Sequence, residues 1–216
     1  MYNKLQYISQ GETIEEQLRN IHQALDAGCE WIQMRFKNQT TQNRLTLGEA
    51  VKLLCDEYQV KFIVNDDLHL AQQIEADGVH LGLTDTKIDE ARAILGSEKI
   101  IGGTANTFED IQNHVKNGCD YIGLGPFRFT ATKEKLSPIL GLSGYFDILQ
   151  RLKKDKIDVP VYAIGGITLR DINPLMETGI NGIAVSGIIT ESDEKEKLIQ
   201  QLNEKLYANV IVQYWR

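Results

Sequence analysis

The segment Gln33-Met34-Arg35-Phe36-Lys37 combines residue types that bind polyanions, and it follows directly on an apolar run. Side chains alternate along a strand, so Gln33, Arg35 and Lys37 share one side and Met34 takes the other. The planar fork of an arginine and the point charge of a lysine both suit phosphate oxygens. The segment therefore predicts a phosphate site at a strand end, with a solvated strand end as the alternative.

Carboxylates end the next two predicted strands. Asp66 and Asp67 follow Asn65, and Asp85 closes the strand after that. Two carboxylates at neighbouring strand ends can share one Mg²⁺, whose other ligands are water and substrate phosphate oxygens. Asp66 and Asp85 are the predicted metal ligands. Asp67 competes with Asp66 for this role, or else caps the following helix.

Two glycine-rich segments close the last predicted strands: Ile164-Gly165-Gly166-Ile167 and Val185-Ser186-Gly187. Glycine allows backbone N–H groups to approach phosphate oxygens closely, and phosphate sites often occupy this place in (β/α)8 barrels. The alternative is two ordinary glycine-rich turns. A cationic site beside a neutral one suits a diphosphate and a monophosphate in one pocket. Departure of a diphosphate needs charge stabilisation rather than an acid/base pair.

His80 lies near these residues, and we expect it to be packed inside the barrel mouth with both ring nitrogens hydrogen-bonded. A catalytic role is the alternative, but no nucleophile stands near it in the sequence. His22, His69 and His114 fall in helical stretches and are expected at the surface.

Eight apolar runs alternate with stretches of helical period, which predicts parallel βαβ units. The runs are Leu5–Ser9, Trp31–Arg35, Phe62–Val64, Gly78–Leu81, Lys99–Gly102, Tyr121–Leu124, Val161–Ile164 and Gly182–Val185. The helical stretches include Glu15–Ala27, Leu47–Tyr58, Ile88–Leu95, Phe108–Lys116 and Leu169–Thr178. Eight units favour one closed (β/α)8 TIM barrel over residues 1–216, with an open doubly wound sheet as the alternative.

Two further features bear on this barrel. Four times a glycine is expected to end a helix just before a strand, at Gly28, Gly78, Gly118 and Gly179. The connection at about 126–144 is long, polar and basic, and it follows the sixth strand. Connections of this length are often functional, so we predict a mobile lid over the site.

Composition excludes several classes of protein. The 216 residues carry a formal net charge of −7, with 42% hydrophobic and 25% charged residues, which argues against binding to nucleic acid or membrane surfaces. The three cysteines are odd in number and widely spaced, so neither a disulfide framework nor a zinc site is indicated. With no signal segment or membrane span visible, we expect a cytoplasmic protein with reduced thiols.

The motifs, taken in order, resemble the thiamine phosphate synthase family from about Leu5 to Ile189. They are Gln33-x-Arg35-x-Lys37, Asn65-Asp66, Ala76-Asp77-Gly78-Val79-His80-Leu81-Gly82, Gly123-x-Gly125-Pro126, Thr130-x-Thr132-Lys133, Ile164-Gly165-Gly166-Ile167 and Val185-Ser186. The resemblance implies that 4-amino-2-methyl-5-pyrimidinylmethyl diphosphate loses diphosphate. The resulting cation is captured by the nitrogen of a thiazole phosphate, which gives thiamine phosphate.

The resemblance also implies residue roles. Gln33, Arg35, Lys37 and Asn65 would hold the diphosphate, and Asp66 and Asp85 would hold Mg²⁺. Lys133 would reach the diphosphate from the lid, and Arg35, Lys37 and Lys133 would carry the catalysis. Thr130, Thr132, Gly166, Val185 and Ser186 would hold the thiazole phosphate, and Thr104 stands where the family has a serine near the pyrimidine.

The sequence departs from the family at three positions. Phe36 replaces a glutamate, Phe129 replaces a proline before the lid threonines, and Asn106 replaces a histidine or hydroxyl residue. Because side chains alternate along a strand, Phe36 is expected to point away from the diphosphate, and its replacement of glutamate should cost little catalytic activity.

Three rival functions share the fold. A thiazole tautomerase would lack the lid motif and the paired aspartates, and a non-catalytic thiazole phosphate binder would lack the cations. A phosphosugar isomerase or aldolase would need a base or a Schiff-base lysine, for which Lys37 is the only loose candidate. The substrates are thus expected to be small molecules, with a homodimer as one possible assembly. The segment Leu206–Arg216 could cover the barrel or form a subunit contact.

Overall fold

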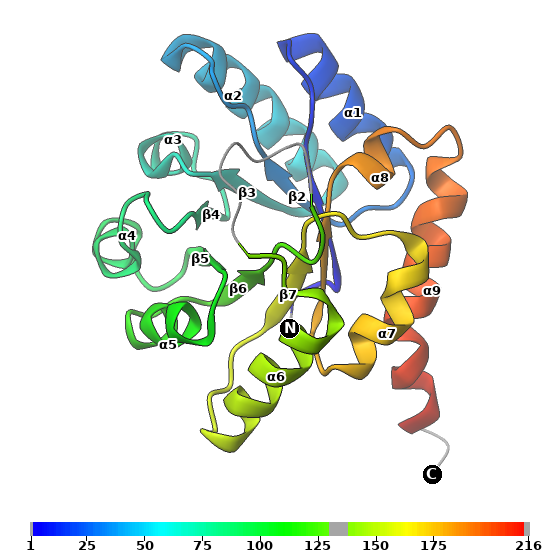
Figure 1. Ribbon diagram of the computed structural model, residues 1–216. Helices are drawn as coiled ribbons and strands as arrows, with labels where there is room; N and C mark the ends of the chain where they lie inside the picture. Colours follow the sequence, from blue (N-terminus) through cyan, green and yellow to red (C-terminus); the bar gives the residue numbers. More distant parts are fainter. Residues whose placement is uncertain (1, 130–137, 214–216) are drawn as a thin grey trace.

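Eight parallel strands form a closed barrel in sequence order, with each strand paired to its neighbours and β8 paired to β1 (Figure 1). The structure is a computed structural model that describes residues 2–129 and 138–213, with side chains described up to residue 208. The strands are β1 (Leu5–Ile8), β2 (Trp31–Met34), β3 (Lys61–Asn65), β4 (Gly78–Leu81), β5 (Ile100–Ala105), β6 (Tyr121–Leu124), β7 (Val161–Ile164) and β8 (Gly182–Val185). The predicted barrel is confirmed, and the open sheet is excluded.

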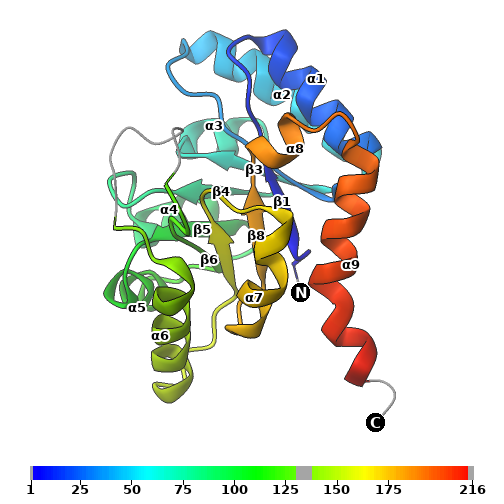
Figure 2. The ribbon, with the colours of Figure 1, turned by 45° about the vertical axis from the view of Figure 1, so that its right-hand side comes forward.

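Helices follow the strands and surround the barrel (Figures 1 and 2). They are α1 (Ile14–Asp26), α2 (Thr41–Tyr58), α3 (Leu68–Gln73), α4 (Ile88–Leu95), α5 (Phe108–Lys116), α6 (Gly141–Lys154), α7 (Ile172–Glu177), α8 (Gly187–Thr190) and α9 (Lys195–Gln213). The predicted helix over Leu169–Thr178 is divided, because the 3₁₀ turn η1 (Leu169–Asp171) precedes α7. Pro174 lies in the first turn of α7, where a missing N–H breaks no helical bond.

The predicted connection over 126–144 is shorter than expected, because α6 begins at Gly141. The prediction ended the connection at Gly144, but Gly141 and Gly144 both lie in α6. The backbone at Gly141 has a positive φ of 55°, a conformation that glycine adopts without steric cost. The chain enters the helix there, so the connection ends before Gly141.

The inward-facing side chains at the amino-terminal end of the barrel form a small apolar cluster. Trp31, Ile63, Ile100, Tyr121 and Tyr162 are buried there, separately from the large core between barrel and helices. The Trp31 ring meets the Tyr121 and Tyr162 rings edge to face at centroid distances of 5.0 and 5.1 Å. This geometry suits the aromatic quadrupole and fills the barrel, so ligands are confined to the opposite end.

A polar side chain directly before an even-numbered strand caps the start of the preceding strand. Asp77 accepts from Phe62 N (2.9 Å), Asp120 from Ile101 N (2.7 Å), and Asn181 Oδ1 from Val161 N (2.8 Å). Each cap satisfies a backbone donor that the barrel ladder leaves unpaired. The weak repeat in the sequence therefore has a structural cause at β3, β5 and β7.

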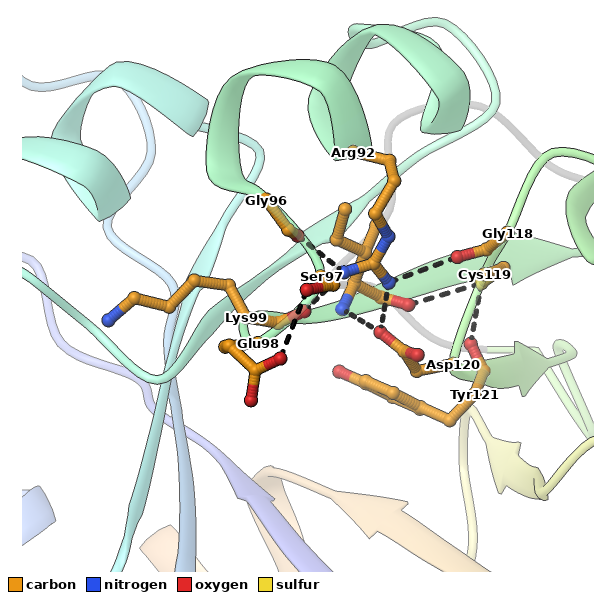
Figure 3. A network of polar contacts seen from close by, with 10 residues as sticks. Arg92, Gly96, Ser97, Glu98, Lys99, Gly118, Cys119, Asp120 and Tyr121 are labelled. Atoms are coloured by element: carbon orange, nitrogen blue, oxygen red, sulfur yellow. Dashed lines mark hydrogen bonds and ion pairs between the residues drawn. The ribbon is translucent and has the colours of Figure 1, made fainter.

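The cap at β5 is reinforced by an arginine (Figure 3). Arg92 pairs with Asp120 and also donates to the carbonyl oxygens of Gly96 (2.9 Å), Lys99 (2.6 Å) and Gly118 (3.0 Å). One guanidinium thus joins the end of α4 to the starts of β5 and β6.

Glycine ends a helix in three of the four predicted places. Gly28, Gly118 and Gly179 have φ values of 89°, 86° and 98°. The prediction was wrong for Gly78, which is the first residue of β4, while the left-handed residue of that turn is Glu75 (φ 53°). A Cβ on Gly78 would lie 1.9 Å from the carbonyl oxygen of Ile100, so the close approach of β5 requires glycine there.

The last helix lies alongside the barrel, packed against α1, α7, α8 and β1, and its later turns reach the start of β1 (Figure 2). Leu206 is buried, and its carbonyl oxygen accepts from Lys4 Nζ at 2.9 Å. The Tyr207 hydroxyl accepts from Lys4 N at 3.1 Å. For Leu206 and Tyr207 these contacts support the first of the two predicted roles, a cover for the barrel.

The three cysteines are free, as predicted. Burial raises the pKa of Cys29 to about 11 and the pKa values of Cys55 and Cys119 to about 12, so these thiols are poor nucleophiles. No helix within the described part of the chain is long and apolar enough to cross a membrane.

Candidate functional site

The end of β2 is held by side chains from three other segments: Ser9 after β1, Gln17 on α1 and Asn65 on β3. Arg35 N donates to Ser9 Oγ at 3.0 Å, and the Arg35 carbonyl oxygen accepts from Gln17 Nε2 at 3.0 Å. Gln33 Nε2 donates to Asn65 Oδ1 at 2.7 Å. Sequence reasoning missed Ser9 and Gln17, although Gln17 lies among apolar residues on the inner face of α1, which was an available signal.

Two cations and one carboxylate meet beyond these strand ends. Lys37 Nζ lies 2.9 Å from Asp66 Oδ2. Burial lowers the pKa of Arg35, and the nearby Asp66 carboxylate partly offsets that effect. A cation that is already withdrawn from water loses less hydration when an anion binds, so Arg35 suits a phosphate ligand.

Asp66 and Asp85 form a carboxylate pair. Burial raises the pKa of the Asp85 carboxyl, and a hydrogen bond with Asp66 raises it further. Asp85 Oδ2 also accepts from Gly82 N at 2.6 Å. Two facing carboxylates repel each other unless a proton or a cation lies between them, so the pair suits a divalent metal.

The backbone supports the same assignment. Asp66 has a φ of 65°, a left-handed conformation that costs a non-glycine residue about 1 kcal/mol or more. Asp67 instead caps α3 by accepting from Leu70 N at 3.0 Å, and it pairs with Arg44 at 3.5 Å. The capping alternative is therefore confirmed for Asp67. Within the described residues no cluster of three His, Cys, Asp or Glu side chains occurs, so a metal here would complete its shell with water or substrate oxygens.

A hollow of about 360 Å³ opens beside this pair, between the ends of β2 and β3 and the helices α2 and α3. It is lined by Phe36, Lys37, Asn38, Arg44, Asn65, Asp66, Asp67, Leu68, His69 and Thr86. Phe36 is buried in the core and also lines the hollow, so its predicted orientation away from the diphosphate stays a prediction. The hollow thus offers cations and carboxylates together to an entering ligand.

Thr104, on β5, lies between two histidines. His80 Nε2 lies 3.0 Å from the Thr104 hydroxyl, and His114 Nε2 lies 2.8 Å from the Thr104 carbonyl oxygen. His80 is buried with both ring nitrogens in hydrogen-bonding contact, as predicted. The prediction of a surface position was wrong for His114, which is 7% exposed. It lies on the inner face of α5, where Gly103 has no Cβ to meet its ring.

The loop after β7 is anchored by a residue that the sequence did not single out. Arg128 donates to the Gly166 carbonyl oxygen at 2.7 Å and binds both oxygens of Asp171 at 2.7 Å. Its guanidinium lowers the pKa of Asp171 to about 2. Gly165 and Gly166 have positive φ values of 91° and 67°, and a Cβ on Gly166 would lie 2.9 Å from Arg128 Cγ. Glycine therefore lets the two loops approach each other.

The end of β8 is held to β1. The Ser186 hydroxyl donates to the Ile8 carbonyl oxygen at 2.6 Å, and α8 begins at the next residue. The Val185 side chain is buried in the core, so only its backbone can contact a ligand. The predicted lid residues Thr130, Thr132 and Lys133 lie outside the described residues.

Fold and site together define a (β/α)8 barrel protein whose carboxyl-terminal end gathers cations, paired carboxylates and glycine-rich loops. The sequence of this barrel is similar to one known protein family. The sequence model described as thiamine monophosphate synthase (TMP-TENI) matches residues 5–189. The chain belongs to the thiamine monophosphate synthase family.

Individual relatives agree with this assignment over almost the whole chain. The thiamine-phosphate synthase of Flavobacterium johnsoniae is 82% identical and covers 98% of this chain and 100% of its own. The thiamine-phosphate synthase of Flavobacterium psychrophilum is 63% identical, and the match covers 95% of this chain and 100% of that protein. The structure of thiamine phosphate pyrophosphorylase from Pyrococcus furiosus superposes with a TM-score of 0.82 at 30% identity, covering 95% of this chain and 96% of that one. The resemblance found in the sequence is thereby confirmed.

Proposed function

We propose that this transferase joins 4-amino-2-methyl-5-pyrimidinylmethyl diphosphate to 4-methyl-5-(2-phosphoethyl)thiazole, with or without a 2-carboxylate, and releases thiamine phosphate and diphosphate. The observation that carries this proposal is the meeting of Arg35, Lys37 and the Asp66–Asp85 pair at one end of the barrel. Cations beside paired carboxylates match a diphosphate that arrives with a divalent metal.

In this proposal the diphosphate is bound by Gln33, Arg35, Lys37 and Asn65. The bond between the methylene carbon and the diphosphate oxygen breaks, and its electron pair leaves with the diphosphate. Arg35 and Lys37 stabilise the negative charge that develops on that oxygen, and Lys133 is assigned the same role from the loop after β6. The lone pair of the thiazole nitrogen then forms the new bond to the methylene carbon.

Asp66 and Asp85 are the proposed Mg²⁺ ligands. When bound, Mg²⁺ neutralises charge on the diphosphate oxygens and favours their departure. The residues themselves fit this role because their mutual repulsion is relieved by a cation. Lys37 already contacts Asp66, so it would also orient that carboxylate.

The thiazole phosphate is assigned to the ends of β7 and β8. Gly166 and Val185 would contribute backbone N–H groups, and Thr130 and Thr132 would contribute hydroxyl groups from the loop after β6. The Ser186 hydroxyl proton is engaged by Ile8, so Ser186 would bind through its backbone N–H. The Arg128–Asp171 pair would hold the Gly166 loop in place for the phosphate.

The test is a diphosphate-release assay with both substrates, with and without a chelator. We expect release that requires both substrates and Mg²⁺, with thiamine phosphate as the product. Tight binding of thiazole phosphate without diphosphate release would contradict the proposal and favour a binder or tautomerase. Asp67→Asn is the matched control for Asp66→Asn, because Asp67 is engaged in capping α3. A homodimer and a cytoplasmic location remain predictions.

A further inference from the structure

A chain of hydrogen bonds crosses the interior of the barrel and ends at Thr104. Gln6 Nε2 lies 3.3 Å from the Tyr121 hydroxyl, which lies 3.0 Å from His80 Nδ1. His80 Nε2 in turn lies 3.0 Å from Thr104 Oγ1. Four side chains from β1, β6, β4 and β5 are therefore linked in series, and the chain ends at Thr104 near the carboxyl end of β5.

The direction of the protons along this chain follows from its first member. The Gln6 amide nitrogen is a donor, so the Tyr121 oxygen accepts there and its single proton is given to His80 Nδ1. Burial raises the pKa of Tyr121 strongly, so the phenol keeps that proton. A neutral imidazole that accepts at Nδ1 carries its proton on Nε2, which donates to Thr104 Oγ1. The proton of Thr104 itself is then directed to another acceptor.

The surrounding backbone is shaped around this chain. A Cβ on Gly102 would lie 2.2 Å from the Tyr121 ring and 2.6 Å from His80 Nδ1. A Cβ on Gly123 would lie 3.0 Å from His80 Cε1. Any larger residue at Gly102 would displace both rings, so this glycine provides the space in which the phenol and imidazole meet.

Thr104 is also held from outside the barrel. His114 Nε2 contacts its carbonyl oxygen at 2.8 Å, and His114 is itself buried in α5. The backbone and the hydroxyl of Thr104 are thus fixed by different histidines. Rotation of the side chain would break the contact with His80, so the hydroxyl is restricted to one orientation.

We propose that Tyr121 and His80 are positioning residues that direct the Thr104 hydroxyl proton towards the pyrimidine diphosphate, so that Thr104 acts there as a hydrogen-bond donor. The site then selects a substrate with an acceptor atom, a ring nitrogen or a phosphate oxygen, opposite Thr104, and disfavours one with an N–H donor there. This inference rests on the proposed function for the identity of the substrate, but the proton arrangement exists without substrate.

The first test therefore needs no turnover. Long-range ¹H–¹⁵N correlation spectra of the full-length protein, assigned with a His80→Gln variant, report which imidazole nitrogen carries the proton. We expect His80 protonated on Nε2 and unprotonated on Nδ1. A proton on Nδ1 would reverse the chain, leave Thr104 as an acceptor, and overturn the inference whether or not the protein is active.

The second test removes one hydroxyl from the aromatic cluster. Tyr121→Phe leaves His80 Nδ1 without its donor, so the imidazole can change tautomer and take the Thr104 proton. We expect the KM for the pyrimidine diphosphate to rise about five- to tenfold, the effect of one hydrogen bond, with the KM for thiazole phosphate unchanged. Tyr162→Phe is the matched control. Its hydroxyl donates to the Asn3 carbonyl oxygen at 3.0 Å, and its ring packs on Tyr121 at 5.8 Å.

A double-mutant cycle with Thr104→Val tests whether Tyr121 affects substrate binding through Thr104. If Tyr121 acts through Thr104, Tyr121→Phe adds no further rise in KM once the threonine hydroxyl is absent. Additive losses, equal losses in Tyr121→Phe and Tyr162→Phe, or an unchanged KM in Tyr121→Phe would each overturn the inference. Absence of turnover in the wild-type protein would instead refute the proposed function and leave the tautomer measurement as the test.

Discussion

The two ends of the barrel use charged residues in opposite ways. At the amino-terminal end Lys61 pairs with Asp77 and Arg92 with Asp120, and both carboxylates also accept a strand N–H. Figure 3 shows the second of these pairs. At the carboxyl-terminal end Asp66 and Asp85 face each other. The amino-terminal pairs hold strands together. At the other end Lys37 pairs with Asp66, but the pKa of Asp85 stays raised, which favours a proton or a bound cation there. The difference separates folding from binding.

Asp66→Asn should have the largest effect, and it should be on activity. Removing one carboxylate weakens the proposed metal site, and we expect turnover to fall by about 100-fold or more. Stability should change little, because the loss of the partly exposed Lys37 ion pair offsets the relief of repulsion with Asp85. Diphosphate release and urea unfolding measure the two quantities. A loss of stability that matches the loss of activity would contradict the separation of roles.

Asp120→Ala should give the opposite result. It leaves the Arg92 guanidinium and Ile101 N without their carboxylate, which should lower the free energy of unfolding by about 2–3 kcal/mol. The catalytic end is remote from this change, so kcat should not change at a temperature where the variant is folded. Urea unfolding together with the release assay checks this, and a selective fall in kcat would show that the two ends are coupled.

Asn181→Ala should have a smaller effect of the same kind. Asn181 caps Val161 N with a neutral amide, whereas Asp120 carries a charge that pairs with Arg92. We expect a loss of about 1 kcal/mol in the free energy of unfolding. If the loss equals that of Asp120→Ala, the charge of the cap contributes nothing and the cap alone accounts for the stability of this end.

The smallest effect concerns pH. The pKa of Asp171 is lowered to about 2 from an ordinary value of 3.8, chiefly by Arg128. A lowered folded-state pKa means that the pair contributes fully above pH 3.8 and loses its contribution as the pH falls towards 2. Acid unfolding curves of the wild-type protein and Asp171→Asn should therefore differ at pH 5 and converge near pH 2. Curves that differ equally at both pH values would show that the charge of Asp171 is not responsible.

Much of the architecture could be predicted because it depends on local patterns. Gly78–Leu81, Tyr121–Leu124, Val161–Ile164 and Gly182–Val185 have the predicted bounds, since short apolar runs between helices mark buried parallel strands. From the sequence, Asp67 could be either a metal ligand or a helix cap, and local pattern could not decide between these roles. That choice depended on which carboxylate faces Asp85, a contact between different strand ends.

The sequence by itself determined the barrel, the family and the clustering of Arg35, Lys37, Asp66 and Asp85 at one end, because alternation and strand direction set these positions. Only the tertiary structure decided the inward place of His114, the anchoring by Arg128 and the chain that orients Thr104. The contact of His80 with Tyr121 spans 41 residues and that with Thr104 spans 24. Such contacts depend on the register with which the barrel closes, and no local pattern carries that information.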